Sequence, residues 1–391
     1  MTASNQKVSL YFDNAATTFP KPEIVWQTMD EFARSGGANA NRGQNPLARR
    51  AARMVEETRN KVANWLEVPA DGYITFAPSA TVALNQVILG LTLPENANIY
   101  VSPFEHNSIL RSVNYLMSKK RVSMREIPFH PLSLEVDWNR LEIQWREAPP
   151  SILAISQASN VCGLLLPVEK LATLARKVNP EVVVVVDGAQ AAGLYPLELK
   201  TGLVDFLIWS GHKSFYGPFG VAGIAFCSQI RPEPILFGGT GTFSEKLEMP
   251  DALPSAYEPG SLNSVAIAGL GASLDWLADI GRATVVAHTA RLTKNLEQSL
   301  SNLSGVRVFG LNLEKKASVF SLTMAGVTPQ ALEEYLGNRG IAVRAGLHCA
   351  PWAHRLLGTL NQGGTIRFSP GYFNTENEIE QVVAALEALL D

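Results

Sequence analysis

The apolar positions between residues 45 and 66 recur every three or four residues and predict one amphipathic helix. Asn45 suits the N-cap of this helix, and Pro46 suits its first turn. Four short apolar runs follow, each ending in polar residues, and their continuity indicates strands that are buried on both faces. These runs are YITFA (73–77), ANIYVS (97–102), SILAISQ (151–157) and VVVVVDG (182–188).

Helix-length segments such as LPVEKLATLARKV separate the apolar runs, which is typical of βαβ units. The sequence therefore predicts an α/β fold with a mostly parallel sheet that helices cover on both faces. In sheets of this kind, ligands collect at the carboxyl ends of the strands.

The pattern changes after residue 255, and a chain of 391 residues is long enough for a second, smaller core. We expect a large domain over 15–255 and a small α+β domain over 256–391, with 1–14 packing onto the small one. The elements predicted there are a long helical stretch (264–303), a strand pair near 306–324, a helix capped by Thr328 and ended by Gly340, and a last helix with a capping box of Thr375 and Glu378.

Composition and charge exclude several classes of protein. The formal net charge is -3, and no long basic run occurs, so a nucleic-acid partner is not expected. The start of the chain lacks the pattern of a signal peptide, and no apolar run is long enough to span a bilayer, which predicts a cytoplasmic protein. The three cysteines include no CxxC pair, so a cysteine with a role here would act as a thiol.

Two charged residues follow the last strands of the predicted sheet. Asp187 ends the run VVVVVDGAQ, where it either caps a turn or serves a ligand. Lys213 lies one βα crossover and one strand later, in IWSGHKS, between two apolar runs. A lysine is usually solvated, but a dry setting would lower its pKa and suit a Schiff-base amine.

An acid that pairs with a pyridinium nitrogen and an amine that forms an imine are what pyridoxal phosphate requires. Its phosphate needs hydroxyls and backbone N–H groups at the start of a helix. The segment FAPSATVALNQVILGL predicts a strand, then Ser79 and Thr81, then a helix, and Ser210 and His212 would complete such a cradle.

Six short segments, in order along nearly the whole chain, resemble the class V aminotransferase-fold enzymes, and more narrowly their cysteine desulfurase and selenocysteine lyase branch. The segments are DNAATT (13–18), EHNS (105–108), SNVCG (159–163), DGAQ (187–190), SGHK (210–213) and HCAP (348–351). The resemblance implies the type I fold of pyridoxal phosphate enzymes.

The resemblance also implies roles for the matching residues. Lys213 would hold the cofactor as a Schiff base, Asp187 would pair with the pyridine nitrogen, and Gln190 would bind the ring hydroxyl. His106 would stack on the ring, and Asn160 would touch its side. The phosphate would be held by Ala80, Thr81, Ser210 and His212, and by Ser261 of a neighbouring subunit, which implies a homodimer with shared active sites.

Arg367, in GGTIRFSPGYFNT, matches the position where the family binds the substrate carboxylate, although it could also be a surface arginine on a strand. Arg344 is a second candidate for the substrate, and local pairing is its ordinary alternative.

Cys349 decides the expected reaction. A cysteine between a histidine and an alanine is commonly a small buried hydrophobe, and HCAPWAH also suggests a metal site, but a fourth ligand is missing, so we expect no metal. The family's cysteine in an RTGHHCAQP-like segment takes sulfur from the substrate as a persulfide, and RAGLHCAPW has its cysteine at the matching place.

The resemblance therefore implies a cysteine desulfurase that converts L-cysteine to L-alanine and loads sulfur onto Cys349. The connection from Gly346 to Arg367 is short, which implies that an acceptor protein or a thiol must approach Cys349. The main alternative is a cysteine, cystine or selenocysteine lyase in which Cys349 is dispensable. From other classes, a catalytically inactive relative remains open, whereas GPFGVAG (217–223) does not open a helix as a dinucleotide motif would.

At two places the sequence departs from the pattern of the family, and these places bear on how the substrate and the phosphate are bound. Ser79, Ala80 and Thr81 stand where many relatives have a glycine and two threonines, and Asn45 stands where relatives often have a histidine. Cys162, beside Asn160, is a second thiol whose expected role is packing.

Overall fold

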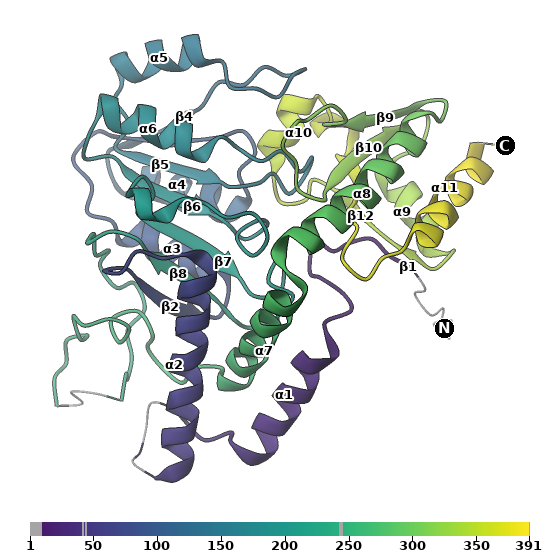
Figure 1. Ribbon diagram of the computed structural model, residues 1–391. Coiled ribbons are helices and arrows are strands. Elements are labelled where there is room, and N and C mark those ends of the chain that lie inside the picture. The colour runs from purple at the N-terminus through teal and green to yellow at the C-terminus, as the bar shows by residue number, and fades with distance from the viewer. Residues whose placement is uncertain (1–9, 41–42, 44, 242–244, 391) are drawn as a thin grey trace.

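The computed structural model describes residues 10–40, 43, 45–241 and 245–390. Within these ranges the chain forms a larger lobe around a seven-stranded sheet and a smaller lobe around a four-stranded sheet (Figure 1). Residues 1–9, part of the segment expected to pack onto the small domain, lie outside the described residues.

The large sheet has the strand order β2-β8-β7-β6-β5-β3-β4. All neighbours from β7 to β4 run parallel, whereas β8 is antiparallel to both β2 and β7. The prediction of an α/β fold with a mostly parallel sheet is therefore confirmed. Its strands are β2 (Tyr73–Ala77), β3 (Ala97–Val101), β4 (Val122–Glu126), β5 (Ile152–Ser156), β6 (Val183–Asp187), β7 (Phe206–Ser210) and β8 (Ala222–Phe226).

Helices cover both faces of this sheet because alternate residues of each strand point to opposite sides. In β5, Leu153 and Ile155 belong to the core under α2, α5, α6 and α7, whereas Ile152 and Ala154 belong to the core under α3 and α4. The helices of this lobe are α2 (Pro46–Leu66), α3 (Ala80–Gly90), α4 (Asn107–Lys119), α5 (Trp138–Glu147) and α6 (Val168–Val178), with a short 3-10 turn η1 (Leu199–Thr201).

The cap predicted for the first long helix is present. The Asn45 side chain accepts a hydrogen bond from Ala48 N at 3.0 Å, and Pro46 is the first residue of α2. Ser79 caps α3 in the same way, accepting from Val82 N at 3.2 Å. The strand, serine and helix order read from FAPSATVALN is therefore confirmed.

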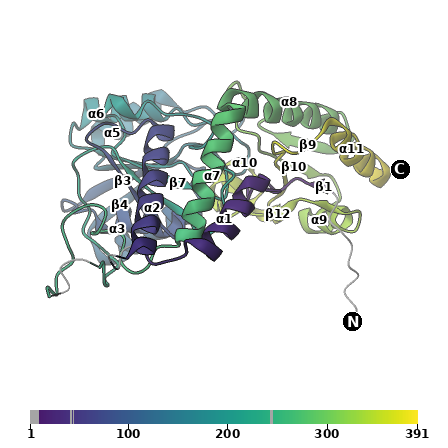
Figure 2. The same ribbon diagram turned by 60° about the horizontal axis from the view of Figure 1, so that its bottom comes forward.

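The helical stretch predicted over 264–303 is wrong in one respect, because it is two helices, α7 (Ser264–Ile280) and α8 (Arg282–Ser301). Gly281 separates them with a φ of 87°, a backbone conformation that an α-helix cannot contain. Figure 2 shows α7 beside α1 (Glu23–Ser35) and α2, while α8 runs over the small lobe. Because α7 contacts helices from before residue 255, the division at 255 stays a prediction.

The small lobe is an α+β unit with the strand order β12-β13-β10-β9. The predicted strand pair is confirmed as antiparallel β9 and β10, and the predicted capping box is confirmed by Thr375 N donating to Glu378 Oε2 at 2.9 Å. Its elements are β9 (Val306–Phe309), β10 (Phe320–Met324), α9 (Pro329–Gly337), β11 (Ile341–Ala342), β12 (Arg344–Gly346), α10 (Pro351–Leu357), η2 (Leu360–Gln362), β13 (Thr365–Phe368) and α11 (Glu376–Leu390).

Two details of this lobe differ from expectation or extend it. Thr328 caps α9 as predicted, but α9 ends at Gly337, and Gly340 (φ 75°) instead turns the chain into β11. The segment before residue 15 contributes β1 (Leu10–Tyr11), which pairs in parallel with β11. The packing of the whole segment 1–14 onto the small domain stays a prediction.

Candidate active site

A cavity of about 110 Å³ lies at the carboxyl ends of the parallel strands. Ser156, Asp187 and Ser210 are the last residues of β5, β6 and β7, so parallel pairing brings all three to one edge of the sheet. The starts of α3 and α4 supply the rest of the wall. The lining residues are Ser79, Ala80, Thr81, His106, Ser108, Ser156, Ala158, Asn160, Asp187, Ala189, Gln190, Ser210, His212 and Lys213.

Lys213 reaches this cavity in the turn that follows β7. Burial lowers its pKa to about 8, an effect that Asp187 opposes and that Arg367 and Arg344 reinforce. About a tenth of the Lys213 amine is therefore neutral at pH 7, far more than for an ordinary lysine, and the neutral amine is the form that attacks a carbonyl.

Asp187 and Gln190 stand on the turn after β6. Asp187 is buried, and its Oδ1 accepts from Ala189 N at 2.9 Å, which fixes the carboxylate at the end of the strand. Gln190 donates from Nε2 to the main-chain oxygen of Ala15 at 2.9 Å, so the segment 13–18 meets this turn.

His106 is the N-cap residue of α4, and its ring lines the cavity. Nδ1 accepts from Ser108 N at 3.1 Å and also contacts the Ser108 hydroxyl, so the neutral ring carries its proton on Nε2. Burial lowers the pKa of His106, and the nearby Lys213 and Arg344 act in the same direction, while Asp187 opposes them. The ring therefore presents a neutral face to the cavity.

Four of the predicted phosphate residues line the cavity. Ser210 and His212 flank the turn after β7, and Ala80 and Thr81 begin α3, where unpaired backbone N–H groups favour an anion. The His212 ring stacks on Phe219 with centroids 4.5 Å apart. Burial, with Lys213 and Lys21 nearby, lowers the pKa of His212 to about 3, so this ring is neutral.

Arg367 is held at the boundary of the two lobes. The side chain is buried, and its Nη2 donates to Asp13 Oδ1 at 2.6 Å while Nη1 donates to the main-chain oxygen of Asn160 at 3.1 Å. Arg344 stands directly opposite Arg367 on β12, and its cation lowers the pKa of Lys213. Both predicted substrate arginines thus face the site.

Cys349 lies on a tight turn beside the cavity. Its main-chain oxygen accepts from Asn107 N at 2.7 Å, immediately after His106, and its thiol side chain is partly exposed. The Cys349 side chain is near enough to the Lys213 amine to raise the pKa of that amine. Cys162 and Cys227 are both buried, so Cys349 is the accessible thiol among the three.

Among the predicted phosphate residues, Ser261 is the one that does not line this cavity. It is exposed, lines a separate pocket, and accepts a hydrogen bond from Asn39 Nδ2 at 3.0 Å. That Ser261 binds the cofactor phosphate of a neighbouring subunit stays a prediction.

Sequence reasoning missed two buried groups behind the site. Glu105 is completely buried, and its carboxylate accepts from the Ser102 hydroxyl at 2.5 Å, from Ser156 N at 3.0 Å and from Ser156 Oγ at 2.7 Å. Burial raises the pKa of Glu105 to about 7. The signal available was its place in the short connection between β3 and α4, immediately before His106.

Lys21 is the second group that was missed. It is buried without a carboxylate partner among the described residues, and Nζ donates to Thr18 Oγ1 at 2.6 Å and to the main-chain oxygen of His212 at 2.7 Å. The segment 17–21 thereby fixes the peptide that precedes Lys213. No local pattern in the sequence signals this contact.

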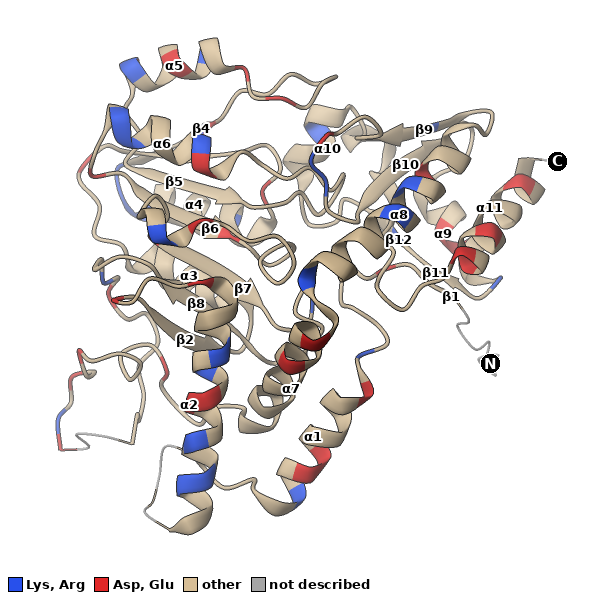
Figure 3. Ribbon diagram, viewed as in Figure 1, with Lys and Arg blue, Asp and Glu red and all other residues tan. Residues whose placement is uncertain are grey.

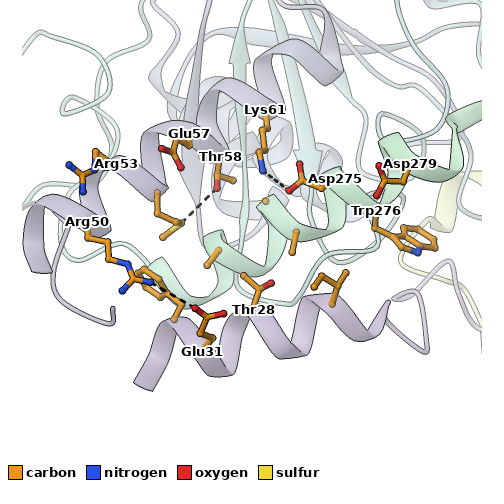
Figure 4. Close-up of a pocket in the computed structure, with 16 residues that line it drawn as sticks. Thr28, Glu31, Arg50, Arg53, Glu57, Thr58, Lys61, Asp275, Trp276 and Asp279 are labelled. Carbon is orange, nitrogen blue, oxygen red and sulfur yellow. Dashed lines mark hydrogen bonds and ion pairs between the residues drawn. The ribbon is translucent and has the colours of Figure 1, made fainter. Parts of the chain in front are cut away.

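A larger groove of about 740 Å³ runs between α1, α2 and α7 (Figure 4). Figure 3 shows basic residues along α2 and acidic residues along α1 and α7. The salt bridges across the groove include Lys61 with Asp275 at 2.6 Å and Arg50 with Glu31 at 3.9 Å. None of the predicted site residues lines this groove, so its size does not make it the site.

In the described part of the chain, no three His, Cys, Asp or Glu residues cluster as metal ligands would. No helix of that part is long and apolar enough to cross a membrane.

The residues present fit pyridoxal phosphate. Asn160 Oδ1 and His212 Nδ1 are buried at the cavity and have no hydrogen-bond partner among the described residues. Buried polar atoms without a partner are costly, so both indicate a polar ligand. An amine with a lowered pKa, a fixed carboxylate and a helix N-terminus surround the same space.

The sequence profile described as Aminotransferase class-V matches residues 10–382. The chain belongs to the class V aminotransferase family. Members of this family are in general pyridoxal phosphate enzymes, and the recognition made from the six motifs is confirmed. A probable cysteine desulfurase of Vibrio cholerae is 31% identical, covering 98% of this chain and 94% of the relative. One from Pseudomonas aeruginosa is 33% identical, covering 97% and 94%.

Solved structures of the class V family show the same fold. A cysteine desulfurase from Thermococcus onnurineus is similar with a TM-score of 0.87 at 30% identity, covering 97% of this chain and 94% of that one. A cysteine desulfurase from Escherichia coli gives a TM-score of 0.84 at 29% identity, covering 99% and 96%. The expected type I fold is therefore confirmed.

Proposed function

We propose that this protein is a cysteine desulfurase that converts L-cysteine to L-alanine and transfers the sulfur to Cys349. The observation that carries the proposal is the position of the turn that contains Cys349. Asn107 N donates to the Cys349 carbonyl at 2.7 Å. Asn107 follows His106, which lines the same cavity as Lys213. An accessible thiol, a partly neutral amine and a buried arginine thus meet at one site.

Pyridoxal phosphate, held by Lys213, Asp187, Gln190, His106, Asn160, Thr81, Ser210 and His212, would supply an electron sink for the substrate's α-carbon. Asp187 would pair with the pyridine nitrogen, and the hydrogen bond from Ala189 N fixes the orientation of its side chain. The neutral His106 ring offers a flat surface for stacking.

The remaining steps belong to side chains of this chain. Arg367 binds the substrate carboxylate, because its guanidinium is already oriented by Asp13 and Asn160. Lys213, with its lowered pKa, accepts the α-proton and returns it. Cys349 attacks the substrate sulfur, so that the carbon–sulfur bond breaks as a sulfur–sulfur bond forms. In sum, cysteine and the Cys349 thiol become alanine and a Cys349 persulfide.

The test is a product balance. Purified protein is incubated with L-cysteine and a thiol reductant, and alanine, pyruvate, ammonia and sulfide are quantified for the wild type, Cys349→Ala and the buried-thiol controls Cys162→Ala and Cys227→Ala. We expect alanine to match sulfide and to be lost in Cys349→Ala alone. Pyruvate and ammonia that persist in Cys349→Ala would instead identify an eliminating lyase.

Three further properties are proposed with this function. The acceptor, a protein or a small thiol, must approach Cys349, because hydrogen bonds to the His348 and Cys349 carbonyls hold the turn in place. The protein would act as a cytoplasmic homodimer in which Ser261 completes the phosphate site of the partner. Parallel assays with L-cysteine and L-selenocysteine would decide whether sulfur or selenium is preferred as the leaving atom.

A further inference from the structure

Cys349 stands on a backbone turn that side-chain-bearing residues seldom adopt. Ala350 N donates to Leu347 O at 2.8 Å, and the two central residues, His348 and Cys349, have φ values of 48° and 57°. Both values lie in the left-handed region that favours glycine. Such a turn persists only where its surroundings hold it.

The carbonyl groups of both central residues are bound by the large lobe. Asn160 Nδ2 donates to the His348 oxygen at 2.6 Å, and Asn107 N donates to the Cys349 oxygen at 2.7 Å. These bonds fix the side of the turn that faces the cavity.

The His348 ring anchors the opposite side of the turn. It is only 4% exposed, and its Nε2 lies 3.1 Å from Oγ1 of Thr365, which is completely buried. Its Nδ1 is buried without a partner among the described residues, so the less costly tautomer carries the proton on Nε2 and donates to Thr365. Burial, reinforced by Arg367, keeps the pKa of His348 far below its usual value and the ring neutral.

Thr365 connects this anchor to the substrate arginine. Thr365 and Arg367 are two residues apart on β13, so their side chains point to the same face of the strand. β12, which leads into the Cys349 turn, pairs Gly346 with Thr365 and Arg344 with Arg367. The His354 ring, itself bonded to Thr359 Oγ1 at 2.8 Å, packs 5.5 Å from the His348 ring and closes the space behind it.

We propose that His348 is a positioning residue: its imidazole anchors the Leu347–Ala350 turn on Thr365, which sets the Cys349 thiol at a fixed place relative to the Arg367 guanidinium. The inference rests on the proposed role of Cys349 as the sulfur acceptor. His348 itself touches neither the substrate nor the cofactor in this scheme.

The test compares Thr365→Val, which removes the hydroxyl at nearly constant volume, with Thr365→Ser, which keeps it. His348→Leu and His348→Gln form a second pair, because a glutamine amide can donate from a place close to that of Nε2. Thr293→Val is the matched control, since Thr293 is a buried threonine whose hydroxyl donates to Thr289 O within α8 at 2.7 Å.

Two readouts are measured on the purified holoenzyme. The first is the rate of iodoacetamide alkylation without substrate, followed by mass spectrometry, which reports Cys349 because Cys162 and Cys227 are 0% and 6% exposed. The second is kcat and KM for L-cysteine.

We expect alkylation of Thr365→Val and His348→Leu to become about threefold faster or more, because the released turn exposes the thiol, while kcat falls about tenfold through misplacement of the nucleophile. KM stays within about twofold, since Arg367 is retained. Thr365→Ser, His348→Gln and Thr293→Val keep wild-type values. General destabilisation is recognised separately, because unfolding would also expose the buried Cys162 and Cys227 to alkylation, which mass spectrometry assigns to each cysteine.

Wild-type alkylation and kcat in both Thr365→Val and His348→Leu would overturn the inference. So would a Thr365→Ser variant that behaves like Thr365→Val, because the hydroxyl would then be irrelevant. If His348→Leu does not fold, the Thr365 pair decides alone. The alkylation rate requires no turnover, so a failure of the proposed desulfurase reaction would be recognised separately, by Cys349→Ala retaining full product formation.

Discussion

Arg344 and Arg367 lie directly opposite each other on the antiparallel strands β12 and β13. Arg367 is neutralised by Asp13 at 2.6 Å, whereas the side chain of Arg344 makes no hydrogen bond or ion pair with the described residues. Two cations side by side with one carboxylate leave a net positive charge at the site, which suits an anionic substrate group.

The first prediction separates the two arginines. Arg367→Lys keeps the charge but loses the forked geometry, so we expect KM for L-cysteine to rise on the order of tenfold or more, because a hydrogen bond to a charged group contributes about 1.5–3 kcal/mol. Arg344→Lys, the matched change on the opposite strand, should alter KM much less. Steady-state kinetics of both variants provide the check, and equal effects would contradict a special role of Arg367.

The second prediction concerns Lys213 in the cofactor-free protein. The pKa of Lys213 is about 8 in the folded chain and 10.5 ordinarily, so between these values the unfolded chain holds a proton that the folded chain has lost. Stability therefore rises with pH across this window. Lys213→Met has no buried amine to deprotonate, so it should be more stable than the wild type below pH 8. The difference in stability should shrink toward pH 10.5. Urea midpoints measured across the window would show it, and parallel curves would count against burial of the amine.

The third prediction concerns Glu105, where the sign is opposite. Its pKa is about 7 in the folded chain against an ordinary 4.5, so the folded chain binds the proton within this window and the unfolded chain does not. Stability contributed by the neutral carboxyl is therefore lost as the pH rises from 4.5 to 7. Glu105→Gln, which keeps one carbonyl oxygen for the Ser102 and Ser156 donors, should lack this loss. Thermal melting of the two proteins is compared as a function of pH. An identical pH dependence would contradict the raised pKa of Glu105.

The fourth prediction uses the bidentate pair of Arg59 and Glu258, with distances of 2.7 and 3.1 Å and both side chains buried. Removing one partner of a buried pair leaves the other charge unpaired, which costs about 3–5 kcal/mol. We therefore expect Glu258→Ala to lower the free energy of unfolding by that amount, measured by urea unfolding.

The matched control for that prediction is Asp275→Ala, which breaks an exposed pair with Lys61 at the same kind of distance, 2.6 Å. Exposed pairs contribute about 0–1 kcal/mol, because water and salt screen them. Similar losses in Glu258→Ala and Asp275→Ala would show that burial does not govern these pairs.

The parts of the site that follow strand ends were predictable from the sequence. Asp187 and Ser210 end β6 and β7, and parallel pairing of neighbouring strands brings them together without any further information. Lys213 follows on the same turn, and the helix start at Ser79 was visible from its capping pattern. These features depend on local periodicity and on one rule of sheet geometry.

The parts that depend on contacts between distant segments were not predictable in this way. Asp13 binds Arg367 across 354 residues of sequence, and Lys21 binds the His212 carbonyl across 191. Apolar periodicity reports which face is buried, but it carries no information on which loop meets which. It also hid the break at Gly281, because the residues on both sides keep a helical pattern while the glycine takes a φ of 87°.

The segment 10–21 is made before the segments that it binds. Leu10 pairs with Ile341, Asn14 donates to the Ser369 carbonyl 355 residues later, and Lys21 binds the turn of Lys213. During synthesis the large sheet can form as the chain emerges, but this segment has no β11 or β13 to join until nearly the whole chain has left the ribosome. A chain that stops early would therefore keep most of its strands and still lack a finished active site.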